Sequence, residues 1–349
     1  MKLFIILLVS AAVTLSCKKN NPDDAIEPGV IENRTFNSTV LIDGHDFDGT
    51  IIRNCIFEDI NGDGLQIRNV DNLCIEDCIF RSISEDGIRF RNSGTSNGVK
   101  ILDNQIYNIA ENGILAPEGH TNTIIKGNTI VNVATSNLSA LGGSPHHGIY
   151  FQGENVTITE NEIHGIVNNQ GNCISIRTYG TISRNILYGA TDHGISYFSD
   201  HPGYGEELLI ENNFIYDNGK RAINLASNGD VVNHIGSATI RFNTLLSEDQ
   251  STIGIQDDLT GVNFDLIANI LLRTDGGSTY IFTTLPFNEE QNMTGDDDMG
   301  FADFINRDFH LFSISPAAGA AVGVSSFPNK DFDGDERSAA SLDVGADEI

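Results

Sequence analysis

Apolar residues recur along the chain in one short pattern: an apolar residue, two variable residues, Asn, a variable residue and a second apolar residue. Successive copies lie roughly 23 to 33 residues apart, and no segment shows a helical period. Short strands repeated at such an interval predict a solenoid. The nine copies are IIRNCIF (51–57), CIEDCIF (74–80), ILDNQIY (101–107), IIKGNTIV (124–131), ITENEIH (158–164), ISRNILY (182–188), IENNFIY (210–216), IRFNTLL (240–246) and LIANILL (266–272).

A second strand, usually opened by Gly, lies between these copies. Two or three short strands per coil predict an all-β fold, a right-handed parallel β-helix. The repeated Asn then forms an internal ladder at one corner, expected at Asn54, Asn104, Asn128, Asn161, Asn185, Asn213, Asn243 and Asn269, with Asp77 in one copy. The second strands are DGLQIRN (63–69), DGIRFRN (86–92), NGILAPE (112–118), HGIYFQG (147–153), NCISIRT (172–178), HGISYFS (193–199) and RAINLAS (221–227).

Over about residues 36–290 these repeats resemble the pectate-lyase-like family of secreted β-helical proteins. The stretches RDFHLFSISPAAGAAVG (307–323) and DFDGDERSAASLDVGADEI (331–349) resemble the closing segment of many such proteins, including polysaccharide lyases of the chondroitinase-B and alginate-lyase type. We therefore expect a β-helix over 36–290 and a capping segment over 291–349.

The chain begins MKLFIILLVSAAVTLSC, with an apolar run from Leu3 to Leu15. This run is shorter than the ~20 residues of a membrane-spanning helix, so residues 1–17 are predicted to be an export signal. Its ending resembles the lipobox of bacterial lipoproteins, which implies lipidation at Cys17. Residues 18–35 then form a tether, and the expected location is the bacterial cell envelope, at the outer membrane or cell surface.

The formal net charge of −28 argues against nucleic acid as a partner, because phosphate binding needs a concentrated positive surface. Cys55 and Cys78 occupy the same slot just after the predicted ladder, on coils ~4.8 Å apart. This spacing and an exported location allow a disulfide, and two stacked free thiols are the alternative. Cys74 and Cys173 fall at apolar positions and are expected in the core.

The second strand of each coil alternates inward and outward side chains. In the coil at 147–153 this places Ile149 and Phe151 in the core and Tyr150 and Gln152 outside. The residue before the Gly lies at a corner, where alternation gives no direction. Over about four coils, or ~15 Å, these positions gather polar and basic residues into a candidate groove. It comprises His147, Tyr150, Gln152, Asn172, Arg177, His193, Arg221 and Asn224, with Arg89 and Arg91 on an earlier coil.

Five of the 20 basic residues lie on or beside this strip of a strongly acidic chain. A local cationic groove predicts an anionic ligand. The segments 133–146 and 199–207 leave the repeat near the groove and are expected to wall a cleft.

Three groove segments, HHGIY (146–150), GNCISIRT (171–178) and DHGISYF (192–198), resemble the active-site strands of polygalacturonases, the β-helical pectin hydrolases. In that family the Asp or His before the Gly carries function, which implies an exposed, groove-facing corner column. Only His193 matches, because His147, Gly171 and Asn172 stand where the family has Asp. Inverting hydrolysis needs two carboxylates, so the hydrolase activity is not expected.

The groove residues suit β-elimination in a uronic-acid polymer instead. That reaction removes the C5 proton, neutralises the carboxylate and protonates the leaving oxygen. We assign proton transfer to Tyr150 and His147, with His193 as a second base. Substrate binding is assigned to Arg177, Asn172, Arg221, Asn224, Gln152, Arg89 and Arg91. The same set would serve a C5-epimerase, and the sequence does not separate the two reactions.

Two other functions remain open: a non-catalytic glycan-binding surface lipoprotein, and a glycoside hydrolase using carboxylates such as Asp192 or Glu154. No metal site is assigned. Calcium is the one cofactor left open, since lyases of the chondroitinase-B and alginate-lyase type use Lys and Arg with calcium. Here Lys126 lies off the proposed face, and the acidic run DFDGDE (331–336) is expected to be a structural cap.

Overall fold

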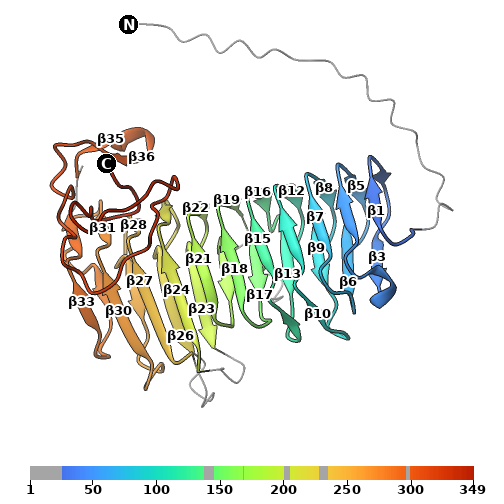
Figure 1. The fold of residues 1–349 in the computed structure, drawn as a ribbon, viewed down its shortest axis with the longest axis horizontal. Helices are drawn as coiled ribbons and strands as arrows, with labels where there is room; N and C mark the ends of the chain where they lie inside the picture. The colour runs from blue at the N-terminus through green and yellow to red at the C-terminus, as the bar shows by residue number, and fades with distance from the viewer. Residues whose placement is uncertain (1–25, 137–144, 168, 200–204, 228–234, 296–298) are drawn as a thin grey trace, which may run out of the picture.

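The computed structural model describes residues 26–136, 145–167, 169–199, 205–227, 235–295 and 299–349. Over these residues the chain winds into a solenoid of three parallel sheets, here named A, B and C, and each coil adds one strand to each sheet in turn (Figure 1). The all-β parallel β-helix predicted from the repeat is confirmed. The sheets run from Val30 to Gly295, a few residues beyond the expected limits of 36 and 290.

The strands are short and follow the sequence pattern closely. Sheet A contains β1 (Val30–Glu32), β4 (Ile51–Arg53), β7 (Cys74–Glu76), β11 (Lys100–Leu102), β15 (Ile124–Lys126), β18 (Val156–Thr159), β21 (Gly180–Ser183), β24 (Glu207–Glu211), β27 (Ser237–Arg241), β30 (Asn263–Ile267) and β33 (Asn288–Glu290). Sheet B contains β2 (Thr35–Phe36), β5 (Ile56–Ile60), β8 (Ile79–Ile83), β12 (Gln105–Ile109), β16 (Thr129–Val133), β19 (Glu162–Ile166), β22 (Ile186–Ala190), β25 (Phe214–Tyr216), β28 (Thr244–Ser247), β31 (Ile270–Arg273) and β34 (Met293–Gly295).

Sheet C carries the second strand of each predicted coil. It contains β3 (Val40–Asp43), β6 (Leu65–Arg68), β9 (Ile88–Phe90), β13 (Ile114–Ala116), β17 (Ile149–Phe151), β20 (Ile174–Ile176), β23 (Ile195–Ser199), β26 (Ile223–Ser227), β29 (Ile253–Ile255) and β32 (Ile281–Phe282). Outside the sheets, β10 (Ser96–Asn97) pairs with β14 (His120–Thr121), and β35 (Phe301–Asp303) pairs antiparallel with β36 (Asp308–Leu311). Within the described ranges, 3-10 turns lie at His45–Phe47 and Phe304–Asn306.

The core is built from columns of equivalent apolar residues. Ile52, Ile75 and Ile101 pair in register on successive strands of sheet A, and all three are fully buried. Each such side chain contributes about 1.5–3 kcal/mol by leaving water. Because every coil repeats the same contacts, the outward face of each sheet is a ladder of side chains with a fixed register.

The predicted Asn ladder lies at the corner between sheets A and B. Asn128 Nδ2 donates to Ile101 O of one neighbouring coil at 2.9 Å and to Asn161 Oδ1 of the other at 3.0 Å. Its backbone N–H donates to the same Asn161 oxygen at 2.9 Å. The ladder runs through Asn104, Asn128, Asn161, Asn185, Asn213, Asn243 and Asn269 as predicted, and it ends at Asn292.

In the first two copies of the repeat the predicted ladder position is wrong by one residue. Asn54 and Asp77 lie just before the ladder position in left-handed backbone conformations, both with φ of 52°. Cys55 and Cys78 occupy the ladder itself, and the Cys78 N–H donates to Asn104 Oδ1 at 2.9 Å. Asn and Asp are also favoured at positive φ, so an Asn in the repeat does not by itself identify the ladder slot.

Both ladder cysteines are free thiols in the structure. Cys55 N–H donates to Cys78 Sγ at 3.4 Å, and Cys78 Sγ donates to Ile52 O at 3.6 Å. The thiols thus repeat, more weakly, the two bonds that Asn makes elsewhere. Cys173 is buried as expected, but Cys74 is not a core residue: it is partly exposed and pairs with Lys100 on the outer face of sheet A.

The C-terminal segment folds back over the last coils of the solenoid (Figure 1). Its Phe309 and Leu311 join Phe242 in a second apolar cluster. The buried Arg337 guanidinium lies over the Phe242 ring at 4.6 Å and donates to Gly345 O at 2.8 Å. In the run DFDGDE, Asp331 accepts backbone N–H groups of Gly334, Asp335 and Glu348 at 2.8–3.1 Å. Asp331 therefore organises a turn of the protein's own backbone. No described helix has the length and apolar character to cross a membrane.

Candidate functional site

The outward positions of sheet C form one continuous row across the predicted groove. Pairing in register places Tyr150, Ser175, Ser196, Asn224, Gly254 and Phe282 on successive coils. Arg177 lies two positions further along its strand than Ser175. The row continues past residue 227, where the predicted series of second strands ends.

The corner column beside this row is a second hydrogen-bonded ladder. His147 Nδ1 accepts the backbone N–H of Asn172 at 3.1 Å, and Asn172 Oδ1 accepts that of His193 at 2.9 Å. His193 Nδ1 accepts that of Arg221 at 3.2 Å. The column comprises Asp63, Asp86, Asn112, His147, Asn172, His193 and Arg221, and all but Arg221 are buried. The polygalacturonase resemblance implied an exposed column, and this expectation is wrong. The side chains are buried because they form hydrogen bonds to the backbone of the next coil.

The two groove histidines are held neutral. Burial lowers the pKa of His147 to about 3, and the positive charge of Arg177 acts in the same direction. Burial lowers the pKa of His193 to about 4, although Asp192 opposes this change. Since Nδ1 of each ring accepts a backbone N–H, the proton of the neutral ring lies on Nε2. Each histidine therefore presents a hydrogen-bond donor, whereas the sequence assigned both to proton transfer.

Tyr150 is the centre of a compact cluster. The Arg177 guanidinium lies over the Tyr150 ring at 5.0 Å, and the His147 ring meets the Tyr150 ring edge-on at 5.3 Å. Gln152 Nε2 donates to the Tyr150 hydroxyl at 2.6 Å. Because that oxygen accepts from Gln152, its own proton points to another acceptor. The cluster combines a phenol, a guanidinium and an imidazole donor within one patch of sheet C.

Arg177 is held between two aromatic rings. Its guanidinium lies 5.0 Å from the Tyr150 centroid and 5.1 Å from that of Phe198, one coil on. Its Nη1 donates to Ser175 Oγ at 3.1 Å. The two cation–π contacts and the bond to Ser175 hold the guanidinium in place beside the Tyr150 ring. Phe198 was not among the residues assigned to the groove from the sequence.

The other predicted residues lie outside this cluster. Arg221 and Asn224 bond to each other two coils further on, at 3.3 Å. Arg89 Nη1 lies 3.3 Å from Asp86 Oδ2, so its charge is engaged by a buried carboxylate. Arg91 follows β9 on the same early coil, and its carbonyl bonds to His120 Nε2 at 3.1 Å. Asn172 uses its amide within the corner column, including a 3.2 Å contact to His147 Nδ1.

The predicted walls of the cleft fall largely on undescribed residues. Residues 137–144 of the first segment and 200–204 of the second lie outside the described part, as does Cys17.

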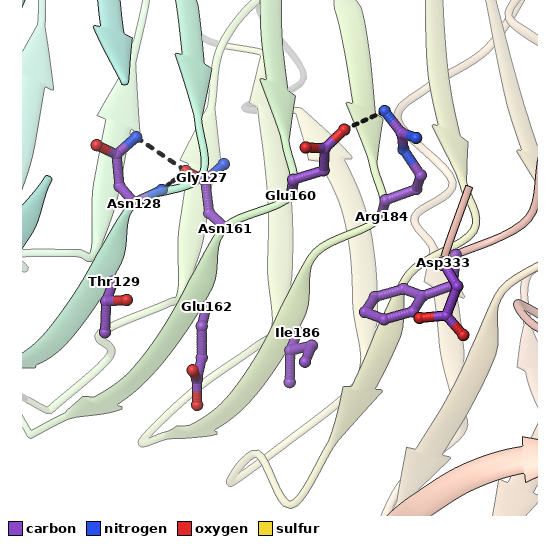
Figure 2. A pocket seen from close by; sticks show the side chains of 10 residues that line it. Gly127, Asn128, Thr129, Glu160, Asn161, Glu162, Arg184, Ile186 and Asp333 are labelled. Atoms are coloured by element: carbon purple, nitrogen blue, oxygen red, sulfur yellow. Dashed lines mark hydrogen bonds and ion pairs between the residues drawn. The ribbon is translucent and has the colours of Figure 1, made fainter. Parts of the chain in front are cut away.

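Two hollows lie away from sheet C, at the Asn-ladder corner. One, of about 450 Å³, is lined by Glu160, Arg184, Phe332 and neighbouring residues, and Figure 2 shows Glu160 paired with Arg184. A second, of about 350 Å³, includes Arg241 and Lys330. Neither hollow is lined by a groove residue.

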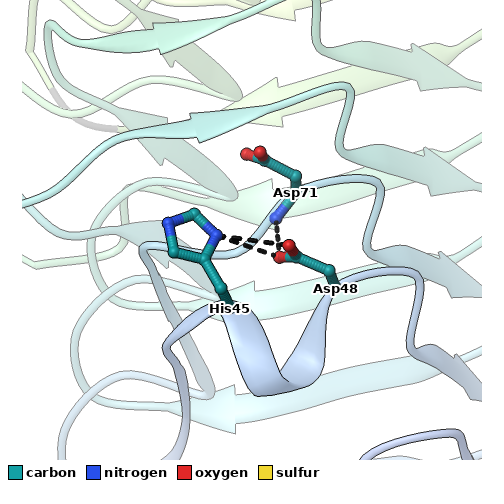
Figure 3. Close-up of side chains that lie close together, drawn as sticks. All are labelled: His45, Asp48 and Asp71. Carbon is teal, nitrogen blue, oxygen red and sulfur yellow. Dashed lines mark hydrogen bonds and ion pairs between the residues drawn. The ribbon is translucent and has the colours of Figure 1, made fainter.

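Two described clusters contain side chains that ligate metals in other proteins. Figure 3 shows His45, Asp48 and Asp71, where Asp48 accepts from the Asp71 N–H at 2.7 Å. The other contains His310, Asp333 and Asp347, with His310 Nε2 at 3.1 Å from Asp333 Oδ2. Calcium takes six to eight oxygen ligands. One imidazole and two carboxylates that already bond to the protein do not fit that requirement.

Several residues of the row were not predicted. Ser251, Gly254 and Phe282 contact the Arg221 side chain, and Gln256 bonds to its partner Asn224. The stretch STIGIQ (251–256) carries the same inward and outward alternation as the earlier second strands, with Gly254 at an outward slot. That continuation is the sequence signal that identifies them.

Comparisons with known proteins give the family. The family described as "Right handed beta helix region" matches residues 38–139 and 93–265. A pectate lyase structure is 13% identical with a TM-score of 0.56, covering 92% of this chain and 86% of that one. The A-module of a mannuronan C-5 epimerase from Azotobacter vinelandii is 12% identical with a TM-score of 0.53, covering 78% and 75%. A search of the curated proteins finds no match.

A third similar structure is the catalytic unit of an α-1,3-glucanase from Streptomyces thermodiastaticus. It is 14% identical with a TM-score of 0.51, and the match covers 78% of this chain and 50% of that one. At such low identities these similarities establish the fold alone.

Proposed function

From the premise that this chain belongs to the right-handed β-helix family, we propose that it acts on an acidic, uronic-acid polysaccharide at the outer face of sheet C. The reaction is β-elimination or inversion at C5. The observation that carries the proposal is the Tyr150 cluster. In it the Arg177 guanidinium makes cation–π contacts with Tyr150 and Phe198, and the His147 ring packs edge-on against Tyr150. The similar pectate lyase and mannuronan epimerase are named for polymers of uronic acids, which supports this substrate class.

The first step requires the substrate carboxylate to be neutralised. A guanidinium can bind a carboxylate through parallel N–H groups, and we assign this role to Arg177, which the contacts to Tyr150 and Phe198 hold at the row. The His147 Nε2–H lies next to the same ring system and supplies a neutral donor for charge that develops on the enolate-like intermediate. A neutral imidazole serves this role without competing for the C5 proton.

Proton transfer falls to Tyr150. Its hydroxyl is oriented by the 2.6 Å bond from Gln152 and is the group in the cluster that can both accept and donate a proton. In elimination Tyr150 takes the C5 proton and gives its own hydroxyl proton to the leaving oxygen, so the phenol is regenerated as the C4–O bond breaks and the C4–C5 double bond forms. In epimerisation Tyr150 takes the C5 proton and passes its hydroxyl proton to solvent, and a proton from solvent water adds to the opposite face of C5. Both reactions share the first step, so the cluster supports either.

A hydrolase mechanism has less support from the described residues. Asp192 is paired with Lys220 and lies 3.8 Å from His193 Nε2, so its carboxylate is engaged. Glu154 follows β17 and pairs with Thr121 through a β-bridge. Non-catalytic glycan binding by stacking is also weakly supported, since the rings of Tyr150 and Phe198 both face Arg177.

The test is absorbance at the unsaturated-uronate band during incubation with alginate, pectate, hyaluronan, chondroitin and heparin. The soluble domain without residues 1–17 is used, with Arg177→Gln as the site variant and Arg53→Gln as the charge-matched control. A rise that Arg177→Gln abolishes and the control retains supports elimination. A flat trace from a protein that exchanges the C5 proton supports epimerisation. Polymer binding with neither signal supports the glycan-binding alternative.

The proposal extends to location. The chain is lipidated at Cys17 and held in the bacterial cell envelope, a statement that rests on the sequence of residues 1–17. Labelled fatty acid should enter the wild-type protein in bacterial cells. No label is expected in Cys17→Ser, and equal labelling of both proteins would refute the anchor.

A further inference from the structure

Arg221 lies in a polar and aromatic setting that resembles the setting of Arg177. Its Nε donates to Ser251 Oγ at 2.9 Å, and its Nη1 donates to Asn224 Oδ1 at 3.3 Å. The guanidinium lies over the Phe282 ring at 5.3 Å. Gln256 Nε2 reaches the same Asn224 oxygen at 3.4 Å. Ser251, Asn224 and Phe282 therefore fix the guanidinium in one orientation; we name these three residues with Arg221 and Gln256 the Arg221 subsite.

Gly254 provides the space in which the Arg221 side chain lies. A Cβ at this position would come within 2.6 Å of Arg221 Cδ and Nε and 3.0 Å of Cζ. Gly254 pairs in register with Asn224 on one side and with Phe282 on the other. The outward slot of β29 is thus occupied by the arginine of the preceding coil, which carries its charge toward the C-terminal end of sheet C.

In the part of the chain that the structure describes, the Arg221 guanidinium has no ion-pair partner. Among the described residues, no carboxylate lies within 4.0 Å of the Arg221 nitrogens, and the nearby Asp192 is paired with Lys220. Arg221 is half-buried, and burial lowers its pKa. A partly desolvated cation whose protein partners are neutral gains more from an incoming anion than a fully solvated one does.

We propose that the Arg221 subsite binds a second carboxylate of the same acidic polysaccharide, so the chain lies along the solenoid axis across both arginines. This inference rests on the proposed function. The Arg177 guanidinium lies at the level of β20, between the rings of Tyr150 on β17 and Phe198 on β23. The Arg221 guanidinium lies over β29, three strands on, or ~14 Å away.

The spacing sets a minimum length for the ligand. One pyranose residue advances an extended polysaccharide by about one strand spacing, ~4.8 Å. Carboxylates on the first and fourth sugars therefore reach Arg177 and Arg221 together. A shorter oligomer can occupy one arginine only. A second charge-assisted pair is expected to strengthen binding about tenfold or more.

The experiment is calorimetric titration of the soluble domain with oligogalacturonates and oligomannuronates of two to six sugars, with neutral gluco-oligomers as the ligand control. The wild type should show a step in affinity of about tenfold or more between the trimer and tetramer of at least one uronate series. Gly254→Leu, which fills the space under Arg221, and Arg221→Gln should remove the step and keep the trimer affinity. Arg241→Gln removes a paired charge from sheet A and should retain the step.

Three results would overturn the inference. Affinity that rises smoothly with length in the wild type, or a step that survives in both Gly254→Leu and Arg221→Gln, refutes the second subsite and leaves the Tyr150 cluster intact. Absence of binding by every uronate oligomer, from protein with native circular dichroism, refutes the subsite and the proposed function together. If the trimer binding is lost in Arg177→Gln but kept in Arg221→Gln while the step fails, uronate binding at Arg177 stands and only the second subsite is refuted.

Discussion

His147 and His193 show how the backbone decides side-chain chemistry at single residues. Nδ1 of each ring accepts a hydrogen bond from a backbone N–H of the next coil, and burial keeps the ring uncharged. A pattern such as HHGIY reveals two histidines beside a strand, but not which nitrogen the fold uses. Tyr150 is different, because strand alternation alone places its hydroxyl outside the core.

Replacement of Tyr150 by Phe tests the proton-transfer assignment. The variant removes the hydroxyl and keeps the ring on which Arg177 stacks. Turnover of the polyuronate substrate should fall about 10²- to 10⁴-fold, with oligomer affinity nearly unchanged. Initial rates and calorimetric titration measure the two quantities. Loss of affinity equal to the loss of rate would mean that Tyr150 holds substrate instead.

Asp86 gives a pH-dependent stability. Burial raises its pKa from 3.8 to about 7, so the folded protein binds this proton more tightly than the unfolded chain. The free energy of unfolding should therefore fall as pH rises from about 4 to about 7 and then level off. Asp86→Asn should remove this fall and raise stability at pH 8 by up to about 4 kcal/mol. Urea denaturation at pH 4.5 and pH 8 measures the difference, and a benefit of equal size at both pH values would contradict the assignment.

At the level of the elements, the short repeats explain why the fold could be predicted and why two ladder positions were predicted wrongly. The spacing of Ile and Asn was sufficient to predict the strands, the inward face and most of the ladder. It was not sufficient at IIRNCIF and CIEDCIF, because Asn and Asp also favour the left-handed residue that precedes the ladder. The side chains that complete each bond lie one coil away, about 24 to 36 residues along the sequence.

The ladder predicts unequal costs for two deletions. Asn161→Ala leaves the buried N–H of Asn128 and the carbonyl of Ile125 without their partners, which should cost about 2–4 kcal/mol. Cys78→Ala removes longer thiol bonds at 3.4 and 3.6 Å and should cost about half as much or less. Denaturant melts of both variants provide the comparison. A larger cost for Cys78→Ala would show that the thiols do more than occupy the ladder position.

At the scale of the whole molecule, the C-terminal segment closes one flank of the solenoid. Arg337 ties this segment to the coils through Asn212 Oδ1 at 3.1 Å and within itself through Glu348 at 3.0 Å. The sequence predicted a cap here from a resemblance. It could not predict which coils the segment covers, because those contacts join residues about 100 or more positions apart.

Arg337→Met tests this closure. The variant preserves much of the side-chain volume but leaves the buried Glu348 carboxylate without its partner, at a cost of about 3–5 kcal/mol. Its denaturation midpoint should fall, and a hydrophobic dye should bind the exposed Phe242 cluster. The surface variant Arg53→Gln, whose ion pair is exposed, should change stability by less than about 1 kcal/mol. Equal effects of the two variants would show that Arg337 does not hold the segment in place.

The charged residues of sheet C differ between the early and the later coils. The early coils carry the buried carboxylates Asp63 and Asp86 with Arg89, whereas the later coils carry Arg177 bonded to Ser175 and Arg221 bonded to Ser251. The composition gives a net charge of −28 but does not show that acidic and basic residues lie on different coils of sheet C. The register supplied this division, because it placed each charged residue on a particular coil and face.

The most direct test of the central claim is solvent hydrogen exchange at C5. The soluble domain and Tyr150→Phe are incubated in deuterium oxide with the polyuronate that binds most tightly, and deuterium at C5 is measured by NMR in substrate and product, alongside any loss of C5 hydrogen by elimination. We predict replacement or loss of the C5 hydrogen with the wild type and neither with Tyr150→Phe. A polyuronate that binds at Arg177 and keeps every C5 hydrogen would contradict the catalytic account.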